Sequence, residues 1–204
     1  MMTLHLPEID RASAADLLAE KPGTVLCAAD VAKKAHRRWD LGQCENAAVL
    51  FCVAAERAAE SPEDPNQYPN YAVRAGITLS LAGYPAVAER TLTEAAAFDW
   101  AGAGLEKDTN MIEWAYTRLL VAAAATHPAR FGALFHEAVA RCAEVGIAYP
   151  RIHPQQDELL PLAQELGEWD ALERIIERTL ARRPLPRAVK AKVAEAQEVL
   201  AATR

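Results

Sequence analysis

The chain has 204 residues, a formal net charge of −6 and an isoelectric point near 5.4. This acidic balance argues against a general nucleic-acid or anionic-membrane binder, because such proteins present a basic face to phosphates or lipid headgroups. Aromatic residues make up only 6% of the chain, which is rich in Ala, Leu, Glu and Arg. That composition favours helices over strands and predicts a single all-α domain, residues 1–204.

No targeting or membrane segment is expected. The first 12 residues have neither a basic start nor an apolar core, so they do not resemble a secretory signal. The longest uncharged run, 75–88, is interrupted by glycine and proline and is shorter than the roughly 20 residues that cross a bilayer. We therefore expect a cytoplasmic protein.

Helical patterns follow one another from the N-terminal end. Ser13 resembles a capping residue for a short N-terminal cap helix over 13–21, and Pro22-Gly23 ends it. Residues 24–40 carry an apolar stripe that includes Trp39, and Leu41-Gly42 follows it. Residues 45–60 form the next predicted helix.

The clearest pattern lies in 71–97, which reads as two short helices. Gly83 is expected at positive φ to end the first helix, and Pro85 fits the first turn of the second. Gly76 and Ala88 are small enough to let the two backbones approach closely. The stretch therefore predicts an αα-hairpin.

The spacing of this hairpin recurs along the chain. Copies start at Ala35, Gly76, Leu119 and Leu160, at offsets of 41 to 43 residues. Such a period predicts an array of four helical hairpins. The expected units are 24–60, 69–98, 109–145 and 156–183, and a C-terminal cap helix over 187–202 covers the last face. Pro161 suggests that the first helix of the fourth unit begins near Asp157.

The connections between the predicted units carry aromatic residues and a histidine: Tyr68, Trp100, Tyr149 and His153. One interpretation is that these rings fill the gaps between hairpins. The other is that they are displayed on loops, where binding residues are often found. The sequence leaves both open.

Motifs for catalysis or metal binding are absent from the sequence. No two histidines have the i, i+4 spacing of paired metal ligands, and there is no Walker loop or G-x-S-x-G. The four cysteines lack a C-x-x-C pair and are expected to be reduced core thiols. Basic clusters at 33–38 and 182–192 are either solvated surface or a site for an acidic protein. We predict no enzyme, metal or cofactor.

At this point the sequence resembles the tetratricopeptide repeat family. The likeness is carried by Ala75-Gly76, Ala47-x₃-Phe51, Gly167-Glu168-Trp169 and Pro184, and covers roughly 28–184. It implies a right-handed solenoid of about four αα-hairpin units between N- and C-terminal capping helices. The period of 41 to 43 residues exceeds the ~34 usual in the family, and other helical repeats, such as the HEAT type, are the alternative.

The resemblance also implies a concave groove, lined by the first helix of each unit, that binds a peptide or a partner helix. The expected function is thus a non-enzymatic protein-binding scaffold. A small-molecule or nucleotide sensor or enzyme with a pocket between helices is the alternative, and self-association into a homodimer is a third hypothesis. Carried over by spacing, the groove residues are Lys33, His36, Asp40, Asn70, Arg74, Ile77, Leu81, Glu113, Tyr116, Leu120, Asp157 and Glu158.

Overall fold

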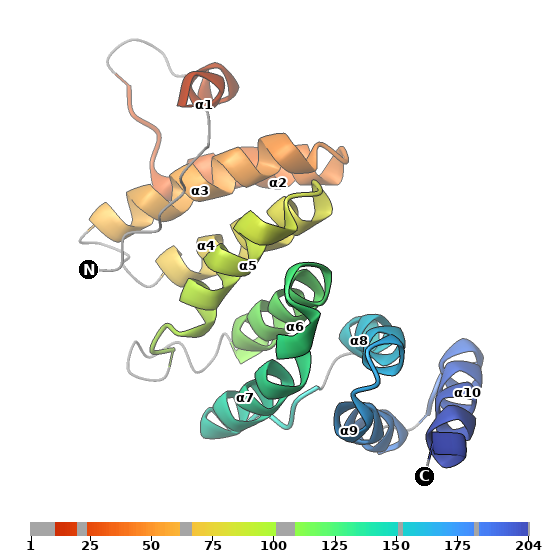
Figure 1. Ribbon diagram of the computed structural model, residues 1–204. Helices are drawn as coiled ribbons and strands as arrows, with labels where there is room; N and C mark the ends of the chain where they lie inside the picture. Colours follow the sequence, from red (N-terminus) through yellow and green to blue (C-terminus); the bar gives the residue numbers. More distant parts are fainter. Residues whose placement is uncertain are drawn as a thin grey trace. The chain divides into compact units, whose positions relative to one another are not determined.

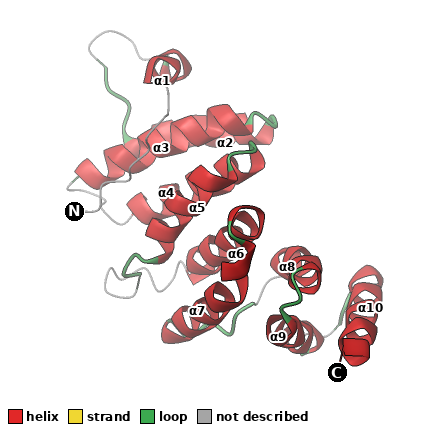
Figure 2. Cartoon of the chain, in the orientation of Figure 1, coloured by secondary structure: helices red, strands yellow, loops and turns green. Residues whose placement is uncertain are grey.

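The computed structural model describes residues 11–19, 24–61, 67–100, 109–150, 153–181 and 184–203 (Figure 1). The side chains of 11, 12, 109, 110 and 153–157 lie outside the described part. Across these ranges the regular secondary structure is entirely helical, which confirms the all-α prediction (Figure 2). The chain packs as two compact units, Met1–Met111 and Ile112–Arg204, here the N-terminal and C-terminal units.

In the N-terminal unit, neighbouring helices along the chain pack against each other. Helix α2 lies on α3, α3 on α4 and α4 on α5, while α1 contacts α3. The core is rich in alanine and closes around the fully buried Leu50 and Phe51 of α3. The described helices of this unit are α1 (Arg11–Leu18), α2 (Ala28–Asp40), α3 (Cys44–Glu60), α4 (Gln67–Leu81) and α5 (Pro85–Ala96).

In the C-terminal unit, α8 packs on α9, and α10 packs on both. The apolar side of α10 is buried at Val189, Val193, Ala196 and Leu200, as the predicted closing helix requires. The described helices are α6 (Thr109–Thr126), η2 (Pro128–Arg130), α7 (Phe131–Glu144), α8 (His153–Glu165), α9 (Trp169–Leu180) and α10 (Arg187–Thr203).

Three helix-to-helix turns share one hydrogen-bond geometry. Gly42, Gly83 and Gly167 take φ of 73°, 88° and 69°, a region that favours glycine. The residue after each glycine donates its backbone N–H to a carbonyl five positions earlier, which satisfies an orphan carbonyl of the helix end. These bonds measure 2.9–3.0 Å and join Gln43 to Arg38, Tyr84 to Leu79 and Glu168 to Ala163.

The same turn thus recurs at the positions where the repeated spacing predicts it. The turn within the third predicted unit, 109–145, is different, because the chain has Thr126 where the other units have glycine. There the 3₁₀ turn η2, which starts at Pro128, connects α6 to α7.

Three local predictions need correction. Helix α1 contains Ser13 instead of beginning after it. Helix α8 begins at His153, before Asp157, and continues through Pro161. Because Pro161 is exposed, water can replace the hydrogen bond that proline removes. Cys27 is exposed and precedes α2, so it is not a core thiol as predicted.

Close approach of α4 and α5 depends on Gly76. A Cβ at this position would overlap Cγ of Leu92, a side chain that is itself fully buried. Leu92 has no free space into which it can move, because protein interiors are close-packed. The predicted role of Gly76 as a contact point between the two helices is confirmed.

We expect Gly76→Ala to lower the free energy of unfolding, because overpacking costs about 1–3 kcal/mol. The roughly 0.5–1 kcal/mol that alanine gains over glycine within a helix offsets only part of that cost. Gly132→Ala in α7 is the matched control, because its Cβ would meet the half-buried carboxylate of Glu168, which can rotate away. Urea denaturation of both variants checks this; equal effects would contradict the proposed role of Leu92.

Candidate functional site

One face of the N-terminal unit combines aromatic and charged side chains from α2 and α4. On α2 the buried side chains Val31, Ala32 and Ala35 point into the core. Lys33 and Asp40 are exposed, and His36 is half-buried. Helix α2 therefore exposes Lys33 and Asp40 and keeps His36 partly open between them and the core.

His36 sits in an aromatic cluster. Its ring is stacked with that of Trp39 at a centroid distance of 6.2 Å and an interplanar angle of 13°. Phe51 of α3 meets His36 edge-on at 4.9 Å and Trp39 edge-on at 6.0 Å. Phe51 is fully buried, whereas His36 and Trp39 are half-buried. The core residue thus supports two rings that keep part of their surface open.

Arg74 of α4 acts electrostatically on the His36 ring of this cluster. Burial lowers the pKa of His36, Arg74 lowers it further, and Asp40 opposes both. The Arg74 guanidinium also donates to the carbonyl of Asn70 at 3.3 Å. Helices α2, α3 and α4 therefore bring His36, Trp39, Phe51 and Arg74 together, although 35 residues or more separate Arg74 from the two α2 rings.

Charged and apolar residues are exposed next to this cluster on α2 and α4. Lys33 forms an ion pair with Asp30 at 2.9 Å, which lowers the pKa of Asp30 and raises that of Lys33. Leu81, seven residues after Arg74 on α4, is 50% exposed. Residues seven apart share one side of a helix. We name Lys33, His36, Trp39, Asp40, Arg74 and Leu81 the His36 face.

The remaining predicted groove residues lie elsewhere. Glu158 is half-buried in the C-terminal unit, and the side chain of Asp157 lies outside the described residues. The others have less than a tenth of their surface open and so do not add to the His36 face. These buried residues are Asn70, Ile77, Glu113, Tyr116 and Leu120.

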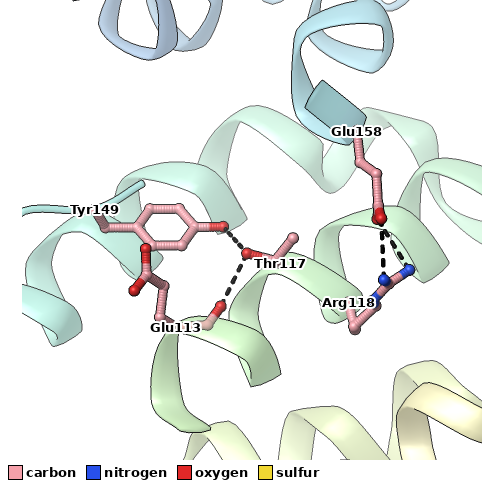
Figure 3. A network of polar contacts seen from close by, with 5 residues as sticks. All are labelled: Glu113, Thr117, Arg118, Tyr149 and Glu158. Atoms are coloured by element: carbon pink, nitrogen blue, oxygen red, sulfur yellow. Dashed lines mark hydrogen bonds and ion pairs between the residues drawn. The ribbon is translucent and has the colours of Figure 1, made fainter. Parts of the chain in front are cut away.

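In the C-terminal unit, a hydrogen-bond chain occupies the interior (Figure 3). Thr117 Oγ1 donates to the carbonyl of Glu113 at 2.9 Å and lies 2.9 Å from the hydroxyl of Tyr149. Because a threonine hydroxyl has one proton, Tyr149 is the donor to Thr117. Tyr149 is fully buried, and burial raises its pKa well above the ordinary value. This chain is structural: it fixes the Tyr149 segment to α6.

Arg118 and Glu158 connect α6 to α8. Two guanidinium nitrogens of Arg118 approach the two carboxylate oxygens of Glu158 at 2.9 and 3.0 Å (Figure 3). The guanidinium also lies 5.5 Å from the ring centre of Trp114, a cation–π distance. Glu158 therefore has a packing role in this unit.

The aromatic residues of the connections are interior residues. Tyr68, Trp100 and Tyr149 are all buried, and the Trp100 indole donates to the carbonyl of Ala95 at 3.0 Å. Burial, with a smaller effect of Glu94, raises the pKa of Tyr68 to about 12. For these three rings the structure supports interior packing over display on loops; the side chain of His153 lies outside the described part.

Groups of metal-ligating residues and membrane-spanning helices were sought in the described part of the chain. Among the described residues, no group of three or more His, Cys, Asp or Glu is placed to hold a metal ion. None of the described helices is both long and apolar enough to cross a bilayer. Comparison of the chain with protein-family models, curated proteins and solved structures gives no match.

Sequence reasoning missed one member of the His36 face. Trp39 was assigned to the core stripe of α2, yet it is half-buried. Its position three residues after His36 was the available signal, because residues at i and i+3 are neighbours on a helix surface.

The hydrogen bond between Thr117 and Tyr149 makes a stability prediction. We expect Thr117→Val to lower the free energy of unfolding by about 1–3 kcal/mol, because it leaves a buried hydroxyl without its acceptor. In a Tyr149→Phe background the same substitution should lower the free energy of unfolding clearly less. Denaturation of the wild type, both single variants and the double variant measures the coupling free energy between the two residues. If the effects of the two substitutions are strictly additive, a direct hydrogen bond is contradicted.

The lowered pKa of His36 makes a pH prediction. Near and below its ordinary pKa of about 6.5, the unfolded chain binds more protons at His36 than the folded chain does. The stability that neutral His36 contributes is therefore complete above that pH and is lost as pH falls through the folded pKa. NMR titration should show the His36 pKa rising in Arg74→Met. Denaturation measures the free energy of unfolding of the wild type and of His36→Gln. The difference between the two values should depend on pH below about 7 and be constant above it.

Proposed function

We propose that the chain is a non-enzymatic module that binds another protein through the His36 face. The observation that carries this proposal is the half-open pair of His36 and Trp39, supported from below by Phe51 and flanked by Arg74. Tryptophan and arginine dominate the binding energy of many protein interfaces, where the bound partner excludes water from them.

Preorganisation favours this face as a contact surface. The rings of His36 and Trp39 are held against each other and against a core residue, so binding freezes few further rotamers. Lys33, Asp40 and Leu81 surround them with both charge signs and an apolar side chain. A polar rim around an aromatic centre is the usual anatomy of a protein interface.

We also infer that the hairpins are tetratricopeptide-like units of a helical array. This inference is supported by the glycine turns at 42, 83 and 167, which share positive φ and the same hydrogen bond. In such an array the first helix of each unit contributes to one binding surface. Helices α2 and α4, which supply the His36 face, are the first helices of the first two units.

The proposal is tested by site-specific photocrosslinking in the native cell. A photoreactive residue at Leu81 should capture a defined partner, whereas the same residue at the exposed Ala59 of α3 should not. The captured protein is then purified and its affinity is measured by calorimetry. Equal capture at both positions would contradict a specific surface.

With the purified partner, we expect Arg74→Glu and Trp39→Ala each to raise the Kd about tenfold or more, a loss typical of interface hot spots. Arg90→Glu on the exposed surface of α5 is the matched control for the charge change. Circular dichroism confirms that each variant is folded. If Arg74→Glu and Arg90→Glu bind alike, or if the chain turns over a defined small molecule, the proposal is wrong.

A further inference from the structure

A groove runs between α9 and α10 in the C-terminal unit. One part, of about 500 Å³, is lined by Leu180, Pro184, Leu185, Lys190, Val193 and Gln197. A second part, of about 280 Å³, is lined by Glu173, Ile176, Glu177, Leu180, Gln197, Leu200 and Ala201. Leu180 and Gln197 line both parts, and the two adjoining parts together are here called the α9–α10 groove.

The lining residues follow helical spacing on both walls. On α9 they fall at i, i+3, i+4 and i+7, from Glu173 to Leu180. On α10 they fall at i, i+3, i+7, i+10 and i+11, from Lys190 to Ala201. Two antiparallel helices whose side chains form parallel ridges leave a groove between them. A ridge of side chains on a third helix fits into such a groove.

The groove is apolar in the middle and oppositely charged at its ends. Ile176 and Val193 form its floor and are buried, whereas Leu180 on the rim is 40% exposed. Lys190 lies at the end near the α9–α10 connection, and Glu173 and Glu177 lie at the other end. The stretch of α9 from Glu173 to Leu180 spans about 10 Å, or two helical turns.

The described surface of this chain offers no helix to fill the groove. Its exposed large apolar side chains, apart from Leu180, lie in loops or at helix ends: Val25, Leu41, Leu81 and Tyr84. None of them forms a stripe along a helix. The exposed residues of α10 are of the types Arg, Lys, Glu, Gln, Ala and Thr. A second copy therefore lacks a complementary element in the described part.

We propose that the α9–α10 groove is a second docking site, independent of the His36 face, for an amphipathic helix of another protein. The bound helix places an apolar stripe of two to three turns against Leu180, Leu185 and Val193. It places an acidic residue at Lys190 and basic residues at Glu173 and Glu177. The small open apolar area predicts a modest affinity that depends on these charges.

The test uses the full chain and a labelled, hydrocarbon-stapled helical peptide of about 14 residues, because short unstapled helices are marginal in water. Its leucines follow three- and four-residue spacing, with glutamate in the first turn and lysines in the last. Fluorescence anisotropy measures binding. A peptide of the same composition with the leucine stripe scrambled should bind about tenfold more weakly.

Variants of the protein distinguish binding of the peptide in the groove from nonspecific attraction of the peptide to an acidic protein. We expect Leu180→Glu to raise the Kd about tenfold or more, while Leu41→Glu, at a leucine of the N-terminal unit that is 70% exposed where Leu180 is 40% exposed, leaves it unchanged. Glu177→Lys should weaken binding of the lysine peptide and strengthen binding of a version with glutamates in place of the lysines. If Leu180→Glu unfolds the protein, Gln197→Trp, which fills both parts of the groove from an exposed position, replaces it.

Two outcomes overturn the proposal. One is equal binding of the peptide to the Leu180→Glu and Leu41→Glu proteins, or indifference to the charge exchange at Glu177. The other is a concentration-dependent dimer in analytical ultracentrifugation that Leu180→Glu dissociates, because the occupant would then be a second copy of the chain.

Discussion

The glycine turn constrains much of this structure. After α2, α4 and α8 the backbone enters positive φ at Gly42, Gly83 and Gly167, and the next N–H closes back onto the helix just completed. This fixes the direction in which the following helix leaves, so that each helix returns along the one before it. The apolar stripe of each helix then packs against the stripe of the other helix in the hairpin. The burial of both stripes therefore depends on the positive φ of one glycine.

Close packing adds a second constraint on the hairpins. Alanines and Gly76 occupy the contact line between helices, where larger side chains would hold the axes apart. The cost of such a small-residue core is limited apolar area for each contact. Larger buried groups such as Phe51, Tyr149 and the Arg118–Glu158 pair then supply contacts that alanine cannot, and in the C-terminal unit a hydroxyl chain fixes Tyr149 in place.

Local signals account for what could be predicted from the sequence. Helix positions and glycine turns depend on residues a few positions apart, and those predictions are largely confirmed. Burial depends on what packs from the other side. In α6, the spacing carried over from the family resemblance predicts Glu113 and Tyr116 as groove residues, yet both are fully buried. Conversely, Trp39 resembled core and is half-open, because Phe51 of α3 fills the space beneath it.

The two proposed surfaces differ in how they would select a partner. At the His36 face, Arg74 beside a histidine of lowered pKa disfavours additional positive charge, and stacked rings supply flat contact area. In the α9–α10 groove, recognition rests on a leucine rim with Glu173 and Glu177 at one end, which attract basic residues. Each surface nevertheless carries both charge signs, with Lys33 and Asp40 on the His36 face and Lys190 at the opposite end of the groove from the two glutamates. Selection at each surface therefore depends on where a partner places its charges, because a like charge at any one of these positions opposes binding.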